Sequence, residues 1–277
     1  MKKKKGIVPI VLLLMAAVSF AAYPILGNYQ KTRMHTQMVQ DYQKMISEFS
    51  REDLRDEWKK ARAYNRSFVQ AAIVAEPFSG SSKSGRGETY ESLLNLGGDG
   101  IMGYLEIPKI KLKLPVMHGV DDDVLARAVG HLPQTSLPVG GKSSHAVLSA
   151  HRGLPSGKLF TDLDQMEEGD IFVLYVLDKE LYYRVNKITV KEPEDTDDLK
   201  IVSGKDYVTL LTCTPYSVNS HRLLVRGERI EKPSDFYARN NTASFFRLHF
   251  YGLAVLGILL VTTVSIAIIL KKQRKPD

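Results

Sequence analysis

The stretch Tyr207-Val208-Thr209-Leu210-Leu211-Thr212-Cys213, followed by Thr214-Pro215-Tyr216, contains the only cysteine of the chain. Its first part is a short run of apolar and β-branched residues, which is typical of a buried β-strand, and the proline is expected to end that strand. Cys213 is therefore predicted to lie at the end of a rigid strand, where a loop begins. Without a disulfide partner in the chain, Cys213 is an inert buried residue, an intermolecular link or a nucleophile.

The region around this strand, from about residue 99 to 232, predicts an all-β domain. Short runs rich in Val, Ile, Leu and Tyr are separated by Gly, Pro or Asp, a pattern typical of a closed barrel or a sandwich. A short helix is expected within residues 161–168. The strand-like runs are 101–107, 109–116, 146–150, 171–177, 181–190, 207–211 and 223–225.

Two less regular zones precede the β domain. Residues 28–75 form a charged region that predicts one or two amphipathic helices, packed on a neighbouring domain or, alternatively, presenting a Met-rich binding surface. Residues 76–98 begin with a Gly-, Ser- and Pro-rich loop, and a loop of that length is usually functional or disordered. The apolar positions that recur every three or four residues in the helical region are Met34, Met38, Met45, Ile46, Phe49, Leu54 and Trp58.

Both ends of the chain carry apolar, charge-free segments beside basic residues. Residues 6–26 follow four lysines, and residues 250–270 precede a basic tail at 271–277. Each segment is long enough to span a bilayer as a helix, and basic flanks stay on the cytoplasmic side. We therefore expect residues 1–27 and 250–270 to be membrane anchors, with both termini cytoplasmic, residues 233–249 as a linker and the β domain outside the cell membrane. Alternatively, Ser19-Phe20-Ala21 marks the cleavage region of a signal peptide.

The charge distribution and the residue types argue against two kinds of function, nucleic-acid binding and metal binding. The chain has a formal net charge of +7 and a pI near 9.2, but much of this excess lies in the two basic tails. No basic stripe with interleaved aromatic residues occurs between them, so nucleic-acid binding is not expected. One cysteine and scattered histidines show no ligand spacing for a metal, and nothing in the sequence indicates a cofactor.

Two further residues make Cys213 a candidate nucleophile. A cysteine is mostly protonated at neutral pH and needs a basic partner to react. His151 follows the strand-like run 146–150, and Arg222 begins the strand after the cysteine loop, where its guanidinium can stabilise charge on a carbonyl oxygen. The rival candidates in the chain are His118, His131, His145 and His221 for the base, and Arg226 for the cation.

Several motifs in this order resemble the sortases, the cysteine transpeptidases of Gram-positive bacteria. Thr209-Leu210-Leu211-Thr212-Cys213 matches their TLxTC signature. The stretches 103–110, 151–155, 159–163 and 213–222 resemble the class C, pilus-building branch. The resemblance covers about residues 99–227 and implies a closed eight-stranded β-barrel with Cys213 as nucleophile, His151 as acid/base and Arg222 stabilising the substrate or oxyanion.

The same resemblance implies a substrate and a lid. The thiolate would attack the Thr–Gly bond of an LPxTG-type sorting signal, and a Lys amine of another pilin would resolve the thioacyl enzyme. Class C members also carry an Asp-Pro-aromatic lid, which corresponds here to Glu76-Pro77-Phe78, with Glu in place of Asp. Two other functions stay open: attachment of surface proteins to a peptidoglycan amine, and a membrane-anchored binding module with an inert cysteine.

Overall fold

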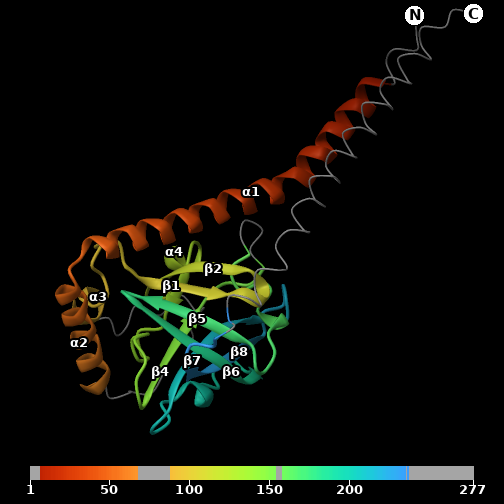
Figure 1. Ribbon diagram of the computed structural model, residues 1–277. Helices are drawn as coiled ribbons and strands as arrows, with labels where there is room; N and C mark the ends of the chain where they lie inside the picture. The colour runs from red at the N-terminus through yellow and green to blue at the C-terminus, as the bar shows by residue number, and fades with distance from the viewer. Residues whose placement is uncertain (1–6, 68–87, 154–157, 235, 237–277) are drawn as a thin grey trace, which may run out of the picture. The chain divides into compact units, whose positions relative to one another are not determined.

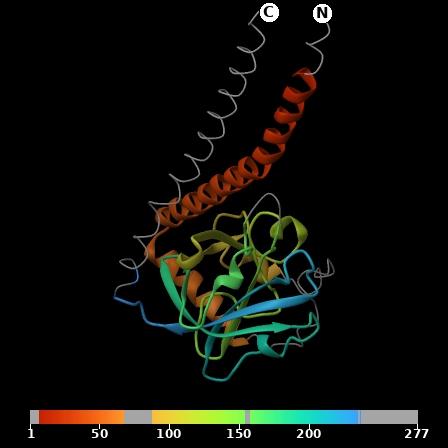
Figure 2. The same cartoon turned by 90° about the vertical axis from the view of Figure 1, so that its right-hand side faces the viewer.

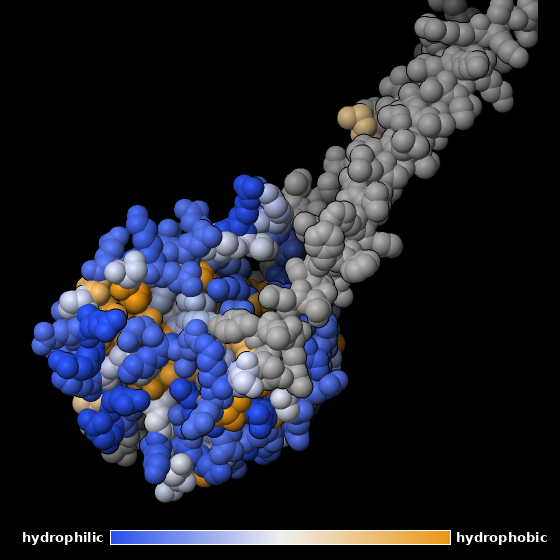
Figure 3. Space-filling model, viewed as in Figure 1, coloured by the Kyte–Doolittle hydropathy of each residue, from blue (hydrophilic) through white to orange (hydrophobic). Residues whose placement is uncertain are grey.

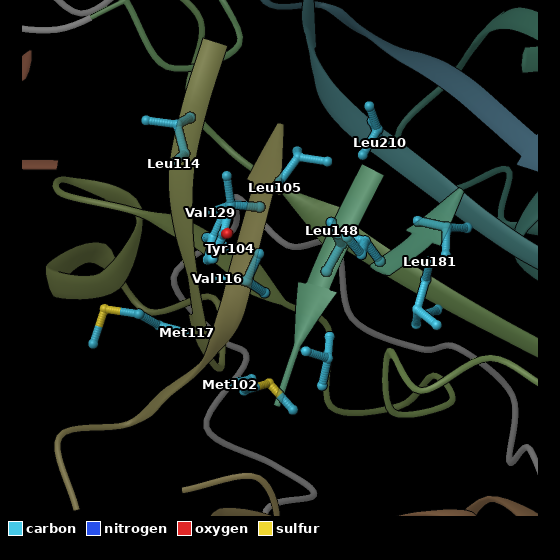
Figure 4. Packing of buried hydrophobic residues seen from close by; sticks show 14 of the residues in the cluster. Met102, Tyr104, Leu105, Leu114, Val116, Met117, Val129, Leu148, Leu181 and Leu210 are labelled. Atoms are coloured by element: carbon cyan, nitrogen blue, oxygen red, sulfur yellow. The ribbon is translucent and has the colours of Figure 1, made fainter. Parts of the chain in front are cut away.

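The computed structural model describes residues 7–67, 88–153, 158–234 and 236. Its centre is a closed antiparallel and parallel barrel of eight strands in the order β1-β2-β3-β4-β7-β8-β6-β5. Figure 1 shows the strands wrapped around a common core, and Figure 4 shows apolar side chains such as Leu105, Leu148 and Leu210 packed inside it. The strands are β1 (Ile101–Ile107), β2 (Leu112–His118), β3 (Val129–His131), β4 (Ser144–Ser149), β5 (Ile171–Val176), β6 (Lys179–Lys191), β7 (Asp206–Thr214) and β8 (His221–Ile230).

The strand that carries Cys213 is central to the barrel. β7 pairs in parallel with β4 and in antiparallel with β8, and its seven inner positions are all buried. Burial on both faces explains why its sequence is a continuous apolar run rather than an alternating one. The predicted end of this strand at the cysteine is confirmed, since β7 stops at Thr214, directly before Pro215.

Other predicted boundaries needed correction. The second strand was expected over 109–116, but Pro108–Ile110 form the 3₁₀ turn η2 and Lys111 adopts a left-handed conformation at φ 53°, so β2 starts at Leu112. Proline favours the first position of a helical turn, which explains the later start. The expected helix in 161–168 is a single 3₁₀ turn, η3 (Leu163–Gln165), and another turn, η4 (Asp197–Leu199), follows β6. β3 escaped prediction because three residues are too few to show a period.

The predicted N-terminal helices are present. α1 (Ile7–Glu48) crosses β1 and β2 in both Figure 1 and Figure 2, and Tyr42 donates a hydrogen bond to the carbonyl of Met102 at 3.1 Å. α2 (Arg51–Ser67) begins after Ser50, whose hydroxyl accepts from the Asp53 amide at 3.1 Å as an N-cap. It buries Leu54, Glu57, Trp58 and Ala61, a stripe at helical spacing. Two short helices, α3 (Glu88–Ser92) and α4 (Asp122–Leu125), complete the fold.

The structure describes part of the first expected membrane anchor, but neither the second anchor nor the lid. In the part of the chain that the structure describes, none of the helices combines the length and hydropathy needed to cross a membrane. The expected second anchor at 250–270 and the lid residues Glu76, Pro77 and Phe78 lie outside the described residues. The face in Figure 3 is mostly hydrophilic around the barrel.

Candidate active site at the end of the barrel

Cys213 and Arg222 face each other across two hydrogen-bonded strands. They are direct partners in the antiparallel register of β7 and β8, and such partners place their side chains on the same face, with Cβ atoms about 5 Å apart. Cys213 is a free cysteine with 7% of its surface exposed. The strand pairing therefore holds the thiol and the guanidinium together without help from the loop that joins the strands.

His151 follows β4, the strand on the other side of β7 from β8, and lies level with Cys213 along the barrel. In the parallel register of β4 and β7, Ser149 pairs with Leu211, and the Ala150 amide continues the ladder with a 3.2 Å hydrogen bond to the Leu211 carbonyl. The hydroxyl of Thr212 also donates to the Ala150 carbonyl, at 2.7 Å. Two residues beyond Ser149, this register brings His151 level with Cys213.

Burial sets the protonation of this pair. It raises the pKa of the Cys213 thiol to about 11, because a thiolate loses more hydration than a thiol. Burial also lowers the pKa of His151, against a smaller opposing effect of Asp122. At neutral pH the resting site therefore holds a thiol and a neutral imidazole.

The Arg222 side chain is fixed by the loop between β7 and β8. Its Nη1 donates to the carbonyls of Asn219 at 3.0 Å and His221 at 2.9 Å. Burial lowers its pKa, but a guanidinium remains charged at any working pH. The structure thus supplies a fixed cation beside the thiol, as electrostatic stabilisation of an oxyanion requires.

Three of the rival histidines are used in the scaffold. The two ring nitrogens of His118 lie 2.9 and 2.8 Å from the carbonyls of Gly100 and Leu93. His131 lies 2.8 Å from both the Tyr90 hydroxyl and the Ser136 carbonyl. His145 contacts the Lys200 carbonyl at 2.9 Å and the Thr209 hydroxyl at 2.8 Å.

The remaining rivals, His221 and Arg226, have partners of their own away from Cys213. His221 pairs in register with Thr214, and neighbouring residues of a strand face opposite sides of the sheet; its ring lies 3.0 Å from the Glu192 carboxylate. Arg226 stacks 4.3 Å over the Tyr207 ring. Neither side chain shares the arrangement of Cys213, His151 and Arg222.

Arg152 is a functional candidate that sequence reasoning missed. Its Nη1 donates to the Thr214 hydroxyl at 3.0 Å and its Nη2 pairs with Asp164 of η3. Only 8% of its side chain is exposed. Arg152 therefore ties the segment after His151 to the residue after Cys213, and the only sequence signal was a charged residue beside the candidate base.

The loop after Cys213 presents apolar side chains to solvent. Tyr216 and Val218 are 53% and 68% exposed, although the loop is closed by a 2.9 Å hydrogen bond from the Asn219 amide to the Pro215 carbonyl. Gly153 lies against it: a Cβ at Gly153 would come within 3.0 Å of the Tyr216 ring, and its φ is +81°. Only glycine suits that position.

The site is built for acyl transfer by a thiol. It places a thiol, an imidazole and a fixed guanidinium at one end of a rigid barrel, the groups that a nucleophile, a base and an oxyanion stabiliser require. Among the described residues, no group of three or more His, Cys, Asp or Glu side chains is arranged to hold a metal ion.

Known proteins share this arrangement of strands. A family model, described as a sortase domain, matches residues 105–230. The structure of sortase C from Streptococcus pneumoniae, described as giving insight into catalysis and pilin substrate specificity, is 39% identical, with a TM-score of 0.63 over 71% of this chain and 97% of that one. Sortase C1 from Streptococcus agalactiae is 41% identical, with a TM-score of 0.64 over 71% of this chain and 100% of that one.

A curated relative extends the comparison by sequence. Sortase D from Bacillus subtilis is 31% identical over 131 residues, which is 46% of this chain and 63% of that protein. The residues that the sortase domain model matches include Cys213, His151 and Arg222. With its closed eight-stranded barrel, its free thiol and its likeness to the class C structures, the chain belongs to the sortase family of cysteine transpeptidases.

Proposed function

We propose that this protein joins pilin subunits covalently, by cleaving an LPxTG-type sorting signal and transferring the pilin to a Lys amine of the next subunit. The observation that carries the proposal is the strand register that aligns Cys213 with Arg222 and brings His151 to their level. The likeness to sortase C, whose structure was described in terms of pilin substrate specificity, supports pilin as the substrate.

The first half of the reaction forms a thioester. His151 takes the proton of Cys213, and the thiolate attacks the threonine carbonyl carbon of the sorting signal while Arg222 stabilises the oxygen that becomes negative. The C–N bond to glycine then breaks, and His151 returns the proton to the leaving glycine amine. The product is a thioacyl enzyme and a released C-terminal peptide.

The second half reverses these roles. A neutral Lys amine attacks the thioester carbon, His151 accepts a proton from the attacking nitrogen, and the Cys213 sulfur leaves. An isopeptide bond joins the two subunits and the thiol is regenerated. A thioester favours this outcome because an amine is a better nucleophile towards it than water.

The resting protonation means that few molecules are reactive at any moment. With the thiol pKa near 11 and the His151 pKa lowered, the thiolate–imidazolium form is a minor population at neutral pH. Bound substrate draws on this minor form, because each thiolate that forms can attack the carbonyl held beside Arg222.

We also propose that Glu76-Pro77-Phe78 closes over Cys213 and inhibits the free enzyme. Phe78 would cover the thiol while Glu76 engages Arg222, with a looser contact than the shorter Asp side chain would make. Glu76→Ala and Phe78→Ala are then expected to speed alkylation of Cys213 by iodoacetamide. Unchanged rates in both variants would rule out this lid.

The location that fits this function is the outer face of the cell membrane. The apolar segments 6–26 and 250–270 and their basic flanks support two anchors with cytoplasmic termini. Mass spectrometry of the mature N-terminus tests this topology: a chain that starts near Ala22 would leave a single anchor.

Purified pilins distinguish polymerisation from attachment to the wall. The full-length enzyme in detergent should convert a pilin into a ladder of covalent multimers, and a pilin without its sorting signal should stay monomeric. Acylation of Cys213 by the pilin, followed by transfer only to peptidoglycan amines, would instead support the wall-anchoring function.

A further inference from the structure

A pocket with three cationic side chains in its lining lies at the end of the barrel opposite to Cys213. It has a volume of about 630 Å³ and is open where β4 begins, whereas His151 follows the other end of β4. His151 comes seven positions after Ser144 along extended chain, or about 23 Å at roughly 3.3 Å per residue. Its lining residues are Arg62, Asn65, Arg66, Gly140, Gly141, Lys142, Ser143, Ser144 and Ile201.

The walls of this pocket are fixed by hydrogen bonds. The Asn65 side chain accepts from the Leu137 amide at 2.8 Å and donates to the Leu137 carbonyl at 3.0 Å. This pair fastens the last turns of α2 to the segment before β4. On the other wall, the Ser144 hydroxyl donates to the Gly141 carbonyl at 2.6 Å, so the pocket has a defined frame.

Positive charge dominates the lining. Arg62 and Arg66 are four residues apart on α2 and therefore share one face of the helix, while Lys142 comes from the β3–β4 segment. Within the described part of the chain, neither Arg66 nor Lys142 forms an ion pair. Two cations thus enter the pocket without an acidic partner.

The nearby acidic group is already engaged. Asp206 accepts hydrogen bonds from the Gly141 amide at 2.8 Å and from the Tyr183 hydroxyl at 3.1 Å. Burial raises its pKa, and Arg62 is among the groups that oppose this rise. Gly141 leaves open space, because no heavy atom lies within 4 Å of the position that a Cβ would take. The space beside Gly141 is therefore open to an anion that the three cations attract, while the Gly141 amide stays bonded to Asp206.

We propose that this pocket binds a phosphate-bearing anion, either a small phosphate ester or the headgroup of an anionic phospholipid. A phosphate group carries up to two negative charges on three acceptor oxygens, which suits two guanidinium forks and one ammonium converging on one space. The distance from Cys213 makes the pocket a binding site separate from the transpeptidase site.

The only tryptophan of the chain reports on this pocket. Trp58 lies 5.4 Å from the Arg62 guanidinium in a cation–π contact, so movement of Arg62 towards an anion should change the indole emission. The full-length protein in uncharged detergent would be titrated with inorganic phosphate, glycerol 3-phosphate or micelle-borne phosphatidylglycerol, with chloride at equal ionic strength as reference. Equilibrium dialysis with radiolabelled glycerol 3-phosphate, and co-migration with labelled phosphatidylglycerol, measure binding independently of the emission.

Matched variants separate a site from general charge attraction. R66Q together with K142Q should weaken phosphate binding at least about tenfold, while peptide acylation of Cys213 stays as in the wild type. R55Q together with K59Q removes the same charge from α2 at side chains that are 64% and 66% exposed and outside the pocket. This control should bind as tightly as the wild type.

The probe that binds distinguishes a soluble phosphate from a lipid headgroup. Saturable binding of phosphate or glycerol 3-phosphate assigns a soluble ester, and binding of phosphatidylglycerol alone assigns a lipid headgroup. Either result supports the pocket if only R66Q/K142Q weakens it. Absence of saturable binding to all three probes, or equal weakening in both double variants, would overturn the proposal.

Discussion

The Cys213 thiol and the His151 ring are neutral at rest for the same physical reason, which is that each loses hydration in its charged form. The two are nonetheless aligned by the backbone of β4 and β7, so a proton can pass between them when substrate arrives. The low thiolate fraction of Cys213 is therefore a property of the free enzyme. It is measurable with a small reagent that needs neither peptide nor pilin.

Alkylation of Cys213 should therefore depend steeply on pH. Because the pKa of the thiol is near 11, the thiolate fraction and the rate with iodoacetamide should rise about tenfold per pH unit between pH 7 and 10. Intact mass gives the rate directly, since the chain has one cysteine, and Cys213→Ser provides the unlabelled control. A rate that levels off below pH 8 would show a stabilised thiolate instead.

Arg222 should matter for the peptide reaction but much less for alkylation. Arg222→Ala removes the charge that faces a developing oxyanion, and loss of such a donor lowers rates about 10² to 10³-fold. Alkylation forms no oxyanion, so it should change little. Arg226→Ala, on the same strand, is the control, and an equal loss of acylation in the two variants would contradict the assigned role.

Among single residues, Cys213, His151 and Arg222 of the candidate site could be predicted from the sequence, but Arg152, which connects the segments beside them, could not. Cys213, His151 and Arg222 each stand where an apolar run meets a loop, and a strand end can be predicted from composition. Arg152 has no such signal, because Thr214 and Asp164 become its partners only after the chain folds. The roles assigned to all of these residues remain predictions.

Among the elements, α2 is held to the segment between α3 and β1 by a buried carboxylate. Glu57 is 5% exposed, and its Oε1 accepts from the Leu94 amide at 2.6 Å. Glu57→Ala leaves that amide without its acceptor and should lower the free energy of unfolding by about 1–3 kcal/mol. Urea unfolding of the full chain measures the change, with Glu52→Ala, at an exposed side chain of the same helix, as control; similar small losses in both would refute this anchoring role.

The elements also show where pattern reading succeeds. β1 spans the predicted Ile101–Ile107, because its apolar run is bounded by Pro108. β2 was predicted too early because a composition of Ile, Lys and Leu does not reveal the left-handed residue Lys111. β3 exists only through its parallel pairing with β2 and antiparallel pairing with β4, which no local pattern encodes.

Over the whole molecule, closure of the barrel depends on pairings between distant strands. A barrel and a sandwich were both compatible with the strand-like runs, and the distinction arises from the pairing of β4 with β7 and of β6 with β8. The family resemblance, rather than periodicity, predicted the eight-stranded barrel that the structure shows.

Two buried histidines should make this barrel sensitive to acid. Burial lowers the pKa of His131 to about 3 and of His145 to about 4. The unfolded chain binds these protons below its ordinary pKa near 6.5 while the folded chain does not, so stability is complete above that pH and is lost as pH falls. Asp206, whose pKa is raised by burial, opposes this trend.

The expected slope is about 1.4 kcal/mol per pH unit for each proton taken up on unfolding. Urea unfolding of the full chain at pH 7, 6 and 5 measures it, and His145→Gln should make the slope shallower. A free energy of unfolding that stays constant from pH 7 to 5 would contradict burial of neutral histidines.

Intact-mass spectrometry of the full-length protein mixed with an LPxTG-type peptide tests most directly whether Cys213 carries out transpeptidation. We expect a peptide-acyl adduct on Cys213 in the wild type or, if the lid is closed, in Phe78→Ala, and none in Cys213→Ala. An adduct that persists in Cys213→Ala, or silence in both the wild type and Phe78→Ala, would contradict transpeptidation of this signal through Cys213.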